Sequence, residues 1–245
     1  IFSILSTDGS TYSYPWTANY LKAGDPVGIN IGSDGKITLK RLSSPSLSGR
    51  VSADGLKLGS QSIAPNAEIL DAAGGTAVKI FPIRLAGMDL TSGKITYYSL
   101  NGSGEIDRMV LNNATGDAYR YGVLTHMESL GEGLYSSYSY EYDVGGTSYS
   151  ISSTSTRYPV QTGPILVDGD PAAPDRILPL TSVKADKISG GTLVSGSRQY
   201  LLADEVIVYE RRDKDYFLST LDRVQELGLS FTGWYDRAEN QGGRI

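Results

Sequence analysis

The chain has 245 residues, of which 40% are hydrophobic and 20% are charged, so it holds enough apolar material for a packed core. A formal net charge of −5 excludes the diffuse positive field that nonspecific binding to nucleic acid or to an anionic membrane requires. With no cysteine and one histidine, disulfides, thiolate metal sites and cysteine nucleophiles are excluded, as are most zinc sites and most histidine-based triads.

Short runs of alternating or β-branched residues, separated by turn residues, predict strands along most of the chain. The run 27–31 is followed by Asp34-Gly35 and then by the run 36–39. Two strands around such a dipeptide are typical of a hairpin closed by a type I′ turn, whose two central residues both need positive φ. Further strands are predicted at 94–98 and 206–209.

One helix is predicted, over Tyr216–Leu227, because apolar residues recur there at a spacing of three and Gly228 can end the helix. No window approaches the roughly 18 apolar residues that a membrane-spanning helix needs. We therefore expect an all-β protein with at most one short helix and no membrane insertion.

The chain also resembles itself at a shift of about 137 to 141 residues. Residues 9–14 are similar to 146–151, and residues 66–69 are similar to 204–207. These pairs predict two tandem, duplicated β-barrels or β-sandwiches: residues 1–116, a first copy that is incomplete at its N-terminus, and residues 117–245, a second copy without its last strand. The alternative is one barrel in which the turn-rich segment 112–117 is a surface loop.

The second copy carries a resemblance to a known family. Its segments Ile188-Ser-Gly-Gly-Thr-Leu193, 200–209, 233–236 and 242–245 resemble the β-rich repeat regions of Gram-positive cell-surface proteins that carry S-layer homology domains. The first copy matches more loosely, and the S-layer homology domain itself is not in the chain. The resemblance implies an extracytoplasmic location and a role in the cell envelope, and it supplies no catalytic residues.

A row of tyrosines, Tyr135, Tyr138, Tyr140 and Tyr142, is the first candidate site. Alternate residues of a strand point to one face, so the last three share a face. If that face is exposed, the flat amphipathic rings can stack on sugars and donate hydrogen bonds to them. The alternative is that the rings form cross-strand pairs or cover a barrel core.

Three aspartates, Asp168, Asp170 and Asp175, are the second candidate site. Carboxylates are the hard oxygen ligands that Ca²⁺ prefers. Their spacing does not fit an EF-hand loop, so a solvated turn is the alternative.

No catalytic group stands out. His126 lies in a predicted strand without an identifiable partner nucleophile, and there is no Gly-x-Ser-x-Gly sequence. No pair among the 27 acidic residues is singled out for glycoside hydrolysis. We therefore expect no enzymatic activity and no cofactor.

The sequence thus predicts a non-catalytic structural or adhesive module of an exported cell-envelope protein, located outside the cell. Its expected partners are cell-envelope polymers or neighbouring surface proteins, and not nucleic acid. Two alternatives stay open: a carbohydrate-binding module that uses the tyrosine face, and a hydrolase with an unrecognised active site.

Overall fold

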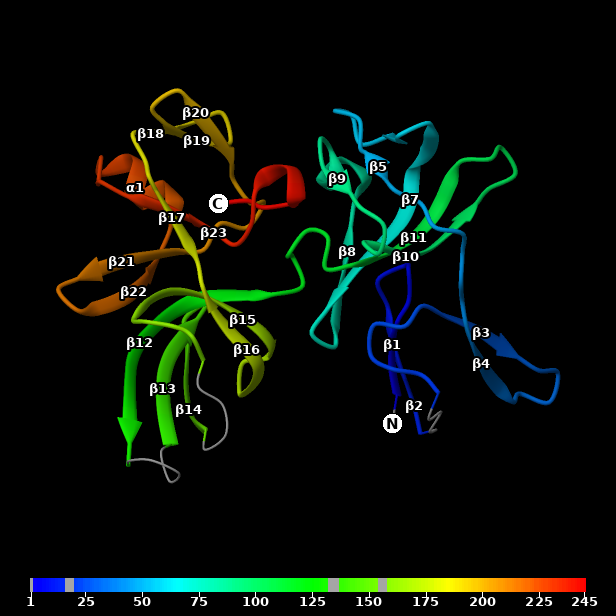
Figure 1. The fold of residues 1–245 in the computed structure, drawn as a ribbon, viewed down its shortest axis with the longest axis horizontal. Coiled ribbons are helices and arrows are strands. Elements are labelled where there is room, and N and C mark those ends of the chain that lie inside the picture. The colour runs from blue at the N-terminus through cyan, green and yellow to red at the C-terminus, as the bar shows by residue number, and fades with distance from the viewer. Residues whose placement is uncertain (1, 16–19, 132–136, 154–157) are drawn as a thin grey trace. The chain divides into compact units, whose positions relative to one another are not determined.

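The computed structural model describes residues 2–15, 20–131, 137–153 and 158–245 (Figure 1). Strands make up 54% of the described residues and helices 6%, which confirms the all-β prediction. The chain forms two compact units: Ile1–Ala118 with Asn240–Gly242, and Tyr119–Glu239 with Gly243–Ile245. The predicted division after residue 116 lies two residues before this one, and the sequence did not predict that a C-terminal segment belongs to unit 1.

In its described residues, unit 1 contains a five-stranded sheet, three two-stranded sheets and one 3-10 helix. Its elements are β1 (Phe2–Leu5), β2 (Thr11–Tyr14), β3 (Val27–Ile31), β4 (Ile37–Arg41), β5 (Gly49–Arg50), β6 (Lys57–Leu58), β7 (Gln61–Ala73), β8 (Thr76–Ile80), η1 (Pro82–Leu85), β9 (Asp89–Leu90), β10 (Ile95–Leu100) and β11 (Ile106–Asn112).

The long strand β7 organises this sheet. The sheet order is β10-β11-β7-β6, with β8 also pairing β7, and β11 runs parallel to β7. Pro65 lies in β7 where the pairing with β11 is irregular, which fits a residue that cannot donate to a strand ladder. The side chains of Ile69, Ile106 and Met109 are fully buried in the core of unit 1.

Three two-stranded pairs complete unit 1: β1-β2, β3-β4 and β5-β9. The predicted hairpin around Asp34-Gly35 is present as β3-β4. The predicted turn type is wrong, because Gly35 has φ +76° whereas Asp34 is not among the residues with positive φ. Asp34 instead accepts a hydrogen bond from the Lys36 amide through Oδ1, so its side chain stabilises the turn.

Within its described residues, unit 2 contains a second five-stranded sheet, a three-stranded sheet, two two-stranded sheets and one α-helix. Its elements are β12 (Arg120–Leu130), β13 (Ser137–Val144), β14 (Thr147–Ser153), β15 (Gly163–Asp170), β16 (Ala173–Pro179), β17 (Thr181–Lys184), β18 (Lys187–Ser189), β19 (Thr192–Ser195), β20 (Arg198–Leu201), β21 (Val208–Arg212), β22 (Asp215–Ser219), α1 (Leu221–Glu226) and β23 (Thr232–Tyr235); a 3-10 turn, η3 (Glu239–Gln241), spans the boundary with unit 1.

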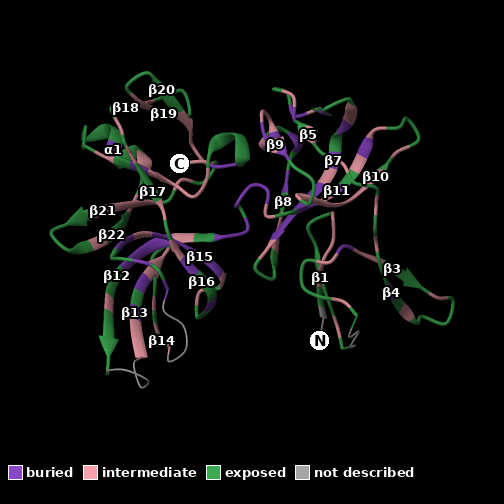
Figure 2. Cartoon of the chain, in the orientation of Figure 1, coloured by how far each residue is buried: buried purple, intermediate pink, exposed green. Residues whose placement is uncertain are grey.

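The main sheet of unit 2 is antiparallel throughout, in the order β14-β13-β12-β15-β16. Leu124, Ile165, Val167 and Ile177 fill its core together with tyrosines described below. Figure 2 shows buried stretches on β12 and β15 of this sheet, whereas hairpin β3-β4 is mostly exposed or intermediate.

The predicted helix is present only in its second half. Residues Tyr216–Ser219 continue strand β22 and pair with β21, and helix α1 begins after Thr220. The Thr220 hydroxyl accepts a hydrogen bond from the Arg223 amide and so caps the helix N-terminus. In the first half of the predicted helix, pairing with β21 therefore decides the backbone conformation, and the three-residue spacing of apolar residues does not.

The structure does not confirm the duplication. The sheet of unit 1 contains a parallel pair, and that of unit 2 contains none. The proposed counterparts also differ locally, because Ile69 lies in the middle of β7 whereas Ile207 precedes β21 outside any strand.

Candidate functional site

The tyrosine row of β13 lies in the core of unit 2 and is not an exposed surface. The side chains of Tyr140 and Tyr142 are 0% and 1% exposed, and Tyr138 is half-buried against the same core. This burial contradicts the prediction that these rings form a sugar-stacking face. Tyr135 lies outside the described residues.

The buried rings pack on other tyrosines of unit 2. Tyr140 meets Tyr158 edge-on at 5.2 Å between ring centroids, and Tyr142 stacks on Tyr149 at 5.7 Å. The alternative considered from the sequence, in which the rings cover a core, is therefore the one observed.

The phenol hydroxyls of this cluster stabilise backbone segments. The Tyr158 amide donates to the Tyr140 hydroxyl at 3.0 Å, and the Tyr158 hydroxyl donates to the Pro174 carbonyl at 2.9 Å. The Tyr142 hydroxyl donates to the Pro171 carbonyl. Burial raises the pKa of both Tyr142 and Tyr158 above the ordinary tyrosine range, so these groups stay neutral donors.

An open hollow of about 420 Å³ lies beside this cluster. Of the described residues, Met127, Tyr158, Pro159, Val160 and Gln161 line it, and none of these five is charged. These five residues offer mainly apolar contact.

The three aspartates predicted as calcium ligands do not converge. Asp168 is 4% exposed, and its Oδ2 accepts hydrogen bonds from Arg176 Nε at 2.9 Å and Nη2 at 2.5 Å. Asp170 accepts from the Ala172 amide at the turn. Within the described residues, which include all three aspartates, no group of three potential ligands could hold a metal ion, so the calcium prediction is wrong.

This arrangement predicts that calcium does not stabilise the protein. The cation Arg176 already neutralises Asp168, and the hydrogen bond to Asp168 raises the pKa of Arg176. We expect the melting temperature to be the same in about 5 mM Ca²⁺ and in excess chelator, measured by circular dichroism, because a ligand bound only by the folded state would raise it. A calcium-dependent rise would contradict this assignment.

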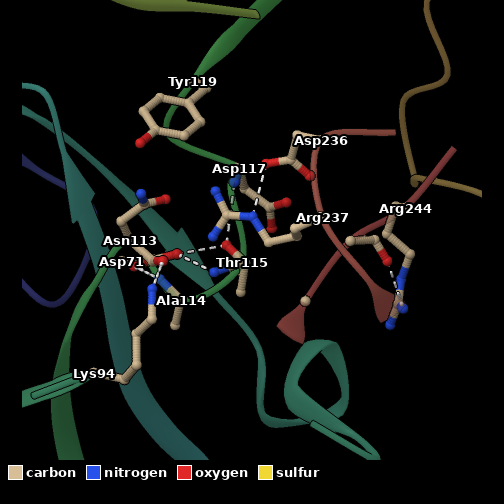
Figure 3. Close-up of polar contacts among 12 residues, drawn as sticks. Asp71, Lys94, Asn113, Ala114, Thr115, Asp117, Tyr119, Asp236, Arg237 and Arg244 are labelled. Carbon is tan, nitrogen blue, oxygen red and sulfur yellow. Dashed lines mark hydrogen bonds and ion pairs between the residues drawn. The ribbon is translucent and has the colours of Figure 1, made fainter. Parts of the chain in front are cut away.

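A buried carboxylate, Asp71, forms the most complete polar site of unit 1 (Figure 3). It lies on β7 and is 0% exposed. Its oxygens accept hydrogen bonds from the amides of Ala114 and Thr115 at 2.9 and 2.7 Å, and from the Thr115 hydroxyl at 2.6 Å. Asp71 therefore fixes the loop that follows β11.

Two cations hold the same loop from other sides. Lys94 Nζ donates to the Asn113 carbonyl at 2.6 Å. Arg84 binds both carboxylate oxygens of Asp117, at 2.9 and 2.8 Å, and donates to the Thr115 carbonyl at 3.1 Å. Asn113 has φ +47°, a left-handed conformation that asparagine tolerates better than most residues. The loop 113–117 is thus rigidly bound to unit 1.

Two neighbouring residues of the hairpin β21-β22, Tyr209 and Glu210, make polar contacts within unit 2. The Tyr209 hydroxyl donates to Asp143 Oδ1 at 2.6 Å and accepts from the Gly145 amide at 2.8 Å. Burial raises the pKa of Tyr209. On the other face, Glu210 binds Arg223 of helix α1, Arg212 at 3.0 Å and Ser219 at 3.1 Å.

The contacts of Glu210 predict a pH dependence of stability. The hydrogen bond from Arg223, followed by that from Arg212, lowers the pKa of Glu210 from 4.5 to about 2. Because the folded-state pKa is the lower one, this contribution is fully present above pH 4.5 and is lost as the pH falls to about 2. We expect Glu210→Gln to flatten the fall in melting temperature over this range, relative to wild type. Glu205→Gln, an exposed position outside this network, is the control and keeps the wild-type slope.

The sole histidine lies on β12. His126 and Glu128 are both about half exposed, and His126 Nε2 lies 3.8 Å from Glu128 Oε2. An exposed pair of this kind contributes little to stability and has no nucleophile beside it in the contacts described.

Sequence reasoning missed Asp71, Glu210 and Tyr209. Asp71 carried a usable signal, since it is a single acid within the apolar run Ile69–Ala73, where a buried charge needs partners. The partners of Glu210 come from β21, β22 and α1, so its spacing in the sequence gave no such signal.

No family model, curated protein or solved structure matches this chain. Among the described residues, no helix is long and apolar enough to cross a bilayer.

Proposed function

We propose that this chain is a non-catalytic structural or adhesive module of an exported cell-envelope protein. The observation that carries the proposal is that its polar and aromatic groups bind other parts of the same protein. The groups best suited to chemistry or to ligand stacking, among them Asp71, Tyr140 and Asp168, are buried and bound to the protein's own backbone or to its own cations.

The organisation of the chain supports the same role. Each unit buries its own apolar cluster, as serial β-modules that act as spacers do. We propose a location outside the cell because residues 188–245 resemble repeat regions of Gram-positive surface proteins. Cell-envelope polymers or neighbouring surface proteins are the partners proposed.

The test is accessibility on intact cells. Antibodies raised against the purified chain should label unpermeabilised cells of the source organism, and protease added outside the cells should remove the label. Labelling that requires permeabilisation would contradict the proposal. A parallel assay of the purified chain against a panel of glycosides and esters should show no turnover above buffer, and turnover that a single carboxylate substitution abolishes would favour the hydrolase alternative.

A further inference from the structure

Strands β7 and β11 are neighbours in the sheet of unit 1 and run parallel to each other (Figure 1). The chain enters β7 at Gln61, and it leaves β11 at Asn112 for the loop 113–117. In a parallel pair, the start of one strand and the end of the other lie at opposite ends of the ladder. A pull between residue 60 and the chain after the loop therefore slides β11 along β7 in shear.

Shear loads the whole ladder at once. Paired residues connect the strands from Ile106↔Ile63 to Asn112↔Ala72, and residues 108–112 pair with 68–72 without a break. The hydrogen bonds of a parallel ladder are evenly spaced, so they share a load along the strands. Peeling the same ladder from one end breaks its bonds one after another. Shear therefore needs the larger force, because several bonds must break in the same event.

The ladder is also shielded from water. The side chains of Ile69, Met109 and Leu111 are fully buried. Strand β11 lies between β7 and β10, so both of its edges are paired. A hydrogen bond is stronger where water is excluded, because the local dielectric constant is lower. This ladder should therefore resist rupture better than a pair at an exposed sheet edge.

Asp71 extends the grip of β7 beyond the end of β11. Its backbone lies opposite Leu111 in the ladder, and its buried carboxylate accepts hydrogen bonds from the amides of Ala114 and Thr115 (Figure 3). A pull on the chain after residue 117 reaches these bonds before it reaches the last ladder pair. The carboxylate therefore protects that end of the ladder from opening.

We propose that the β7-β11 pair, together with the Asp71 carboxylate, is a mechanical clamp that resists tension along the chain. The biological meaning of the clamp rests on the proposed function, because a structural or adhesive module is pulled when its partner is pulled. Mechanical resistance itself is measured on the purified chain and does not depend on location. Failed labelling of intact cells would therefore remove the proposed function, and a failed force measurement would remove the clamp.

Optical tweezers can load this ladder in two directions. The chain has no cysteine, so DNA handles attach only to introduced ones. Ser60→Cys with Arg120→Cys pulls β7 from its start, in shear, and Ala73→Cys with Arg120→Cys pulls it from its end, so that the pair peels. Ser60 and Arg120 are exposed and Ala73 is partly exposed. The complete chain is used, and unit 2, which begins at Tyr119, lies outside the loaded segment apart from its first two residues.

The shear pair of handles should unfold at a force at least about twofold higher than the peeling pair at the same loading rate, because forced unfolding reports the barrier in the direction of the pull. The released chain, about 200 Å for 60–120 and about 160 Å for 73–120, identifies each event. Both double variants should keep the wild-type urea midpoint, so that the difference in force belongs to the direction. Equal forces, or a higher force for the peeling pair, overturn the proposal.

The part played by Asp71 is tested with the shear handles. Asp71→Asn removes the charge from the bonds to the loop 113–117, so unfolding at a fixed force should become about tenfold faster. Leu39→Ala is the control, since Leu39 is buried in hairpin β3-β4 outside the loaded segment, and its rate should equal that of wild type. An unchanged rate for Asp71→Asn, or an equal acceleration by Leu39→Ala, contradicts the clamp.

Discussion

Replacing Asp71 with alanine is expected to lower the free energy of unfolding by about 4 kcal/mol. The substitution removes three hydrogen bonds to a buried carboxylate and leaves the amides of Ala114 and Thr115 without their acceptor. Each unsatisfied buried donor costs about 1–3 kcal/mol, and hydrogen bonds to charged groups are the stronger ones. Urea unfolding followed by circular dichroism measures the loss.

The matched control removes one of these bonds only. Thr115→Val deletes the hydroxyl that donates to Asp71 and accepts from the Asp117 amide, and it keeps the Thr115 amide in place, so it should cost about 1–2 kcal/mol. If Asp71→Ala were no more destabilising than Thr115→Val, the carboxylate would not be what fixes the loop after β11.

Replacing Tyr140 with alanine should destabilise the protein by about 3–5 kcal/mol, because it opens a cavity in the core of unit 2. The ring is 0% exposed and packs edge-on against Tyr158. Tyr140→Phe keeps the ring but removes the acceptor of the Tyr158 amide, and about 1–2 kcal/mol is expected for it. The same urea experiment measures both losses.

An exposed tyrosine supplies the control for Tyr140. Tyr12 is 44% exposed on β2, so Tyr12→Ala should cost less than about 1 kcal/mol. A stable Tyr140→Ala variant that loses binding to a sugar would contradict the structural role and restore the ligand-stacking hypothesis.

The predictable parts of the fold are those set by neighbouring residues. Turn residues such as Asp34-Gly35 and alternating runs such as 27–31 depend on local φ/ψ preferences and on a period of two. The end of helix α1 follows the same logic, since Gly228 has φ +58°, where glycine is favoured. The start of the helix was predicted wrongly because Tyr216–Ser219 pair with β21 across a tight turn at residues 213 and 214, a hairpin that the helix prediction did not take into account.

The candidate sites show the limit of local reasoning. Alternation along β13 correctly groups Tyr138, Tyr140 and Tyr142 on one face, but it cannot tell which face the core covers. Closeness in the sequence also misled the calcium prediction for the three aspartates. Arg176, which lies opposite Asp168 in the β15-β16 pair, is the side chain that binds Asp168.

By itself, the sequence determined the all-β class, the β3-β4 hairpin and the end of the single helix, because each follows from dihedral preferences and side-chain alternation within a few residues. Only the tertiary structure decided the rest: the parallel pairing of β11 with β7, the inward face of the tyrosine row, and the contacts of Asp71 with residues 43 and 44 positions away. These features depend on which surfaces exclude water and on which distant backbone groups need a hydrogen-bond partner, and no local pattern encodes either one.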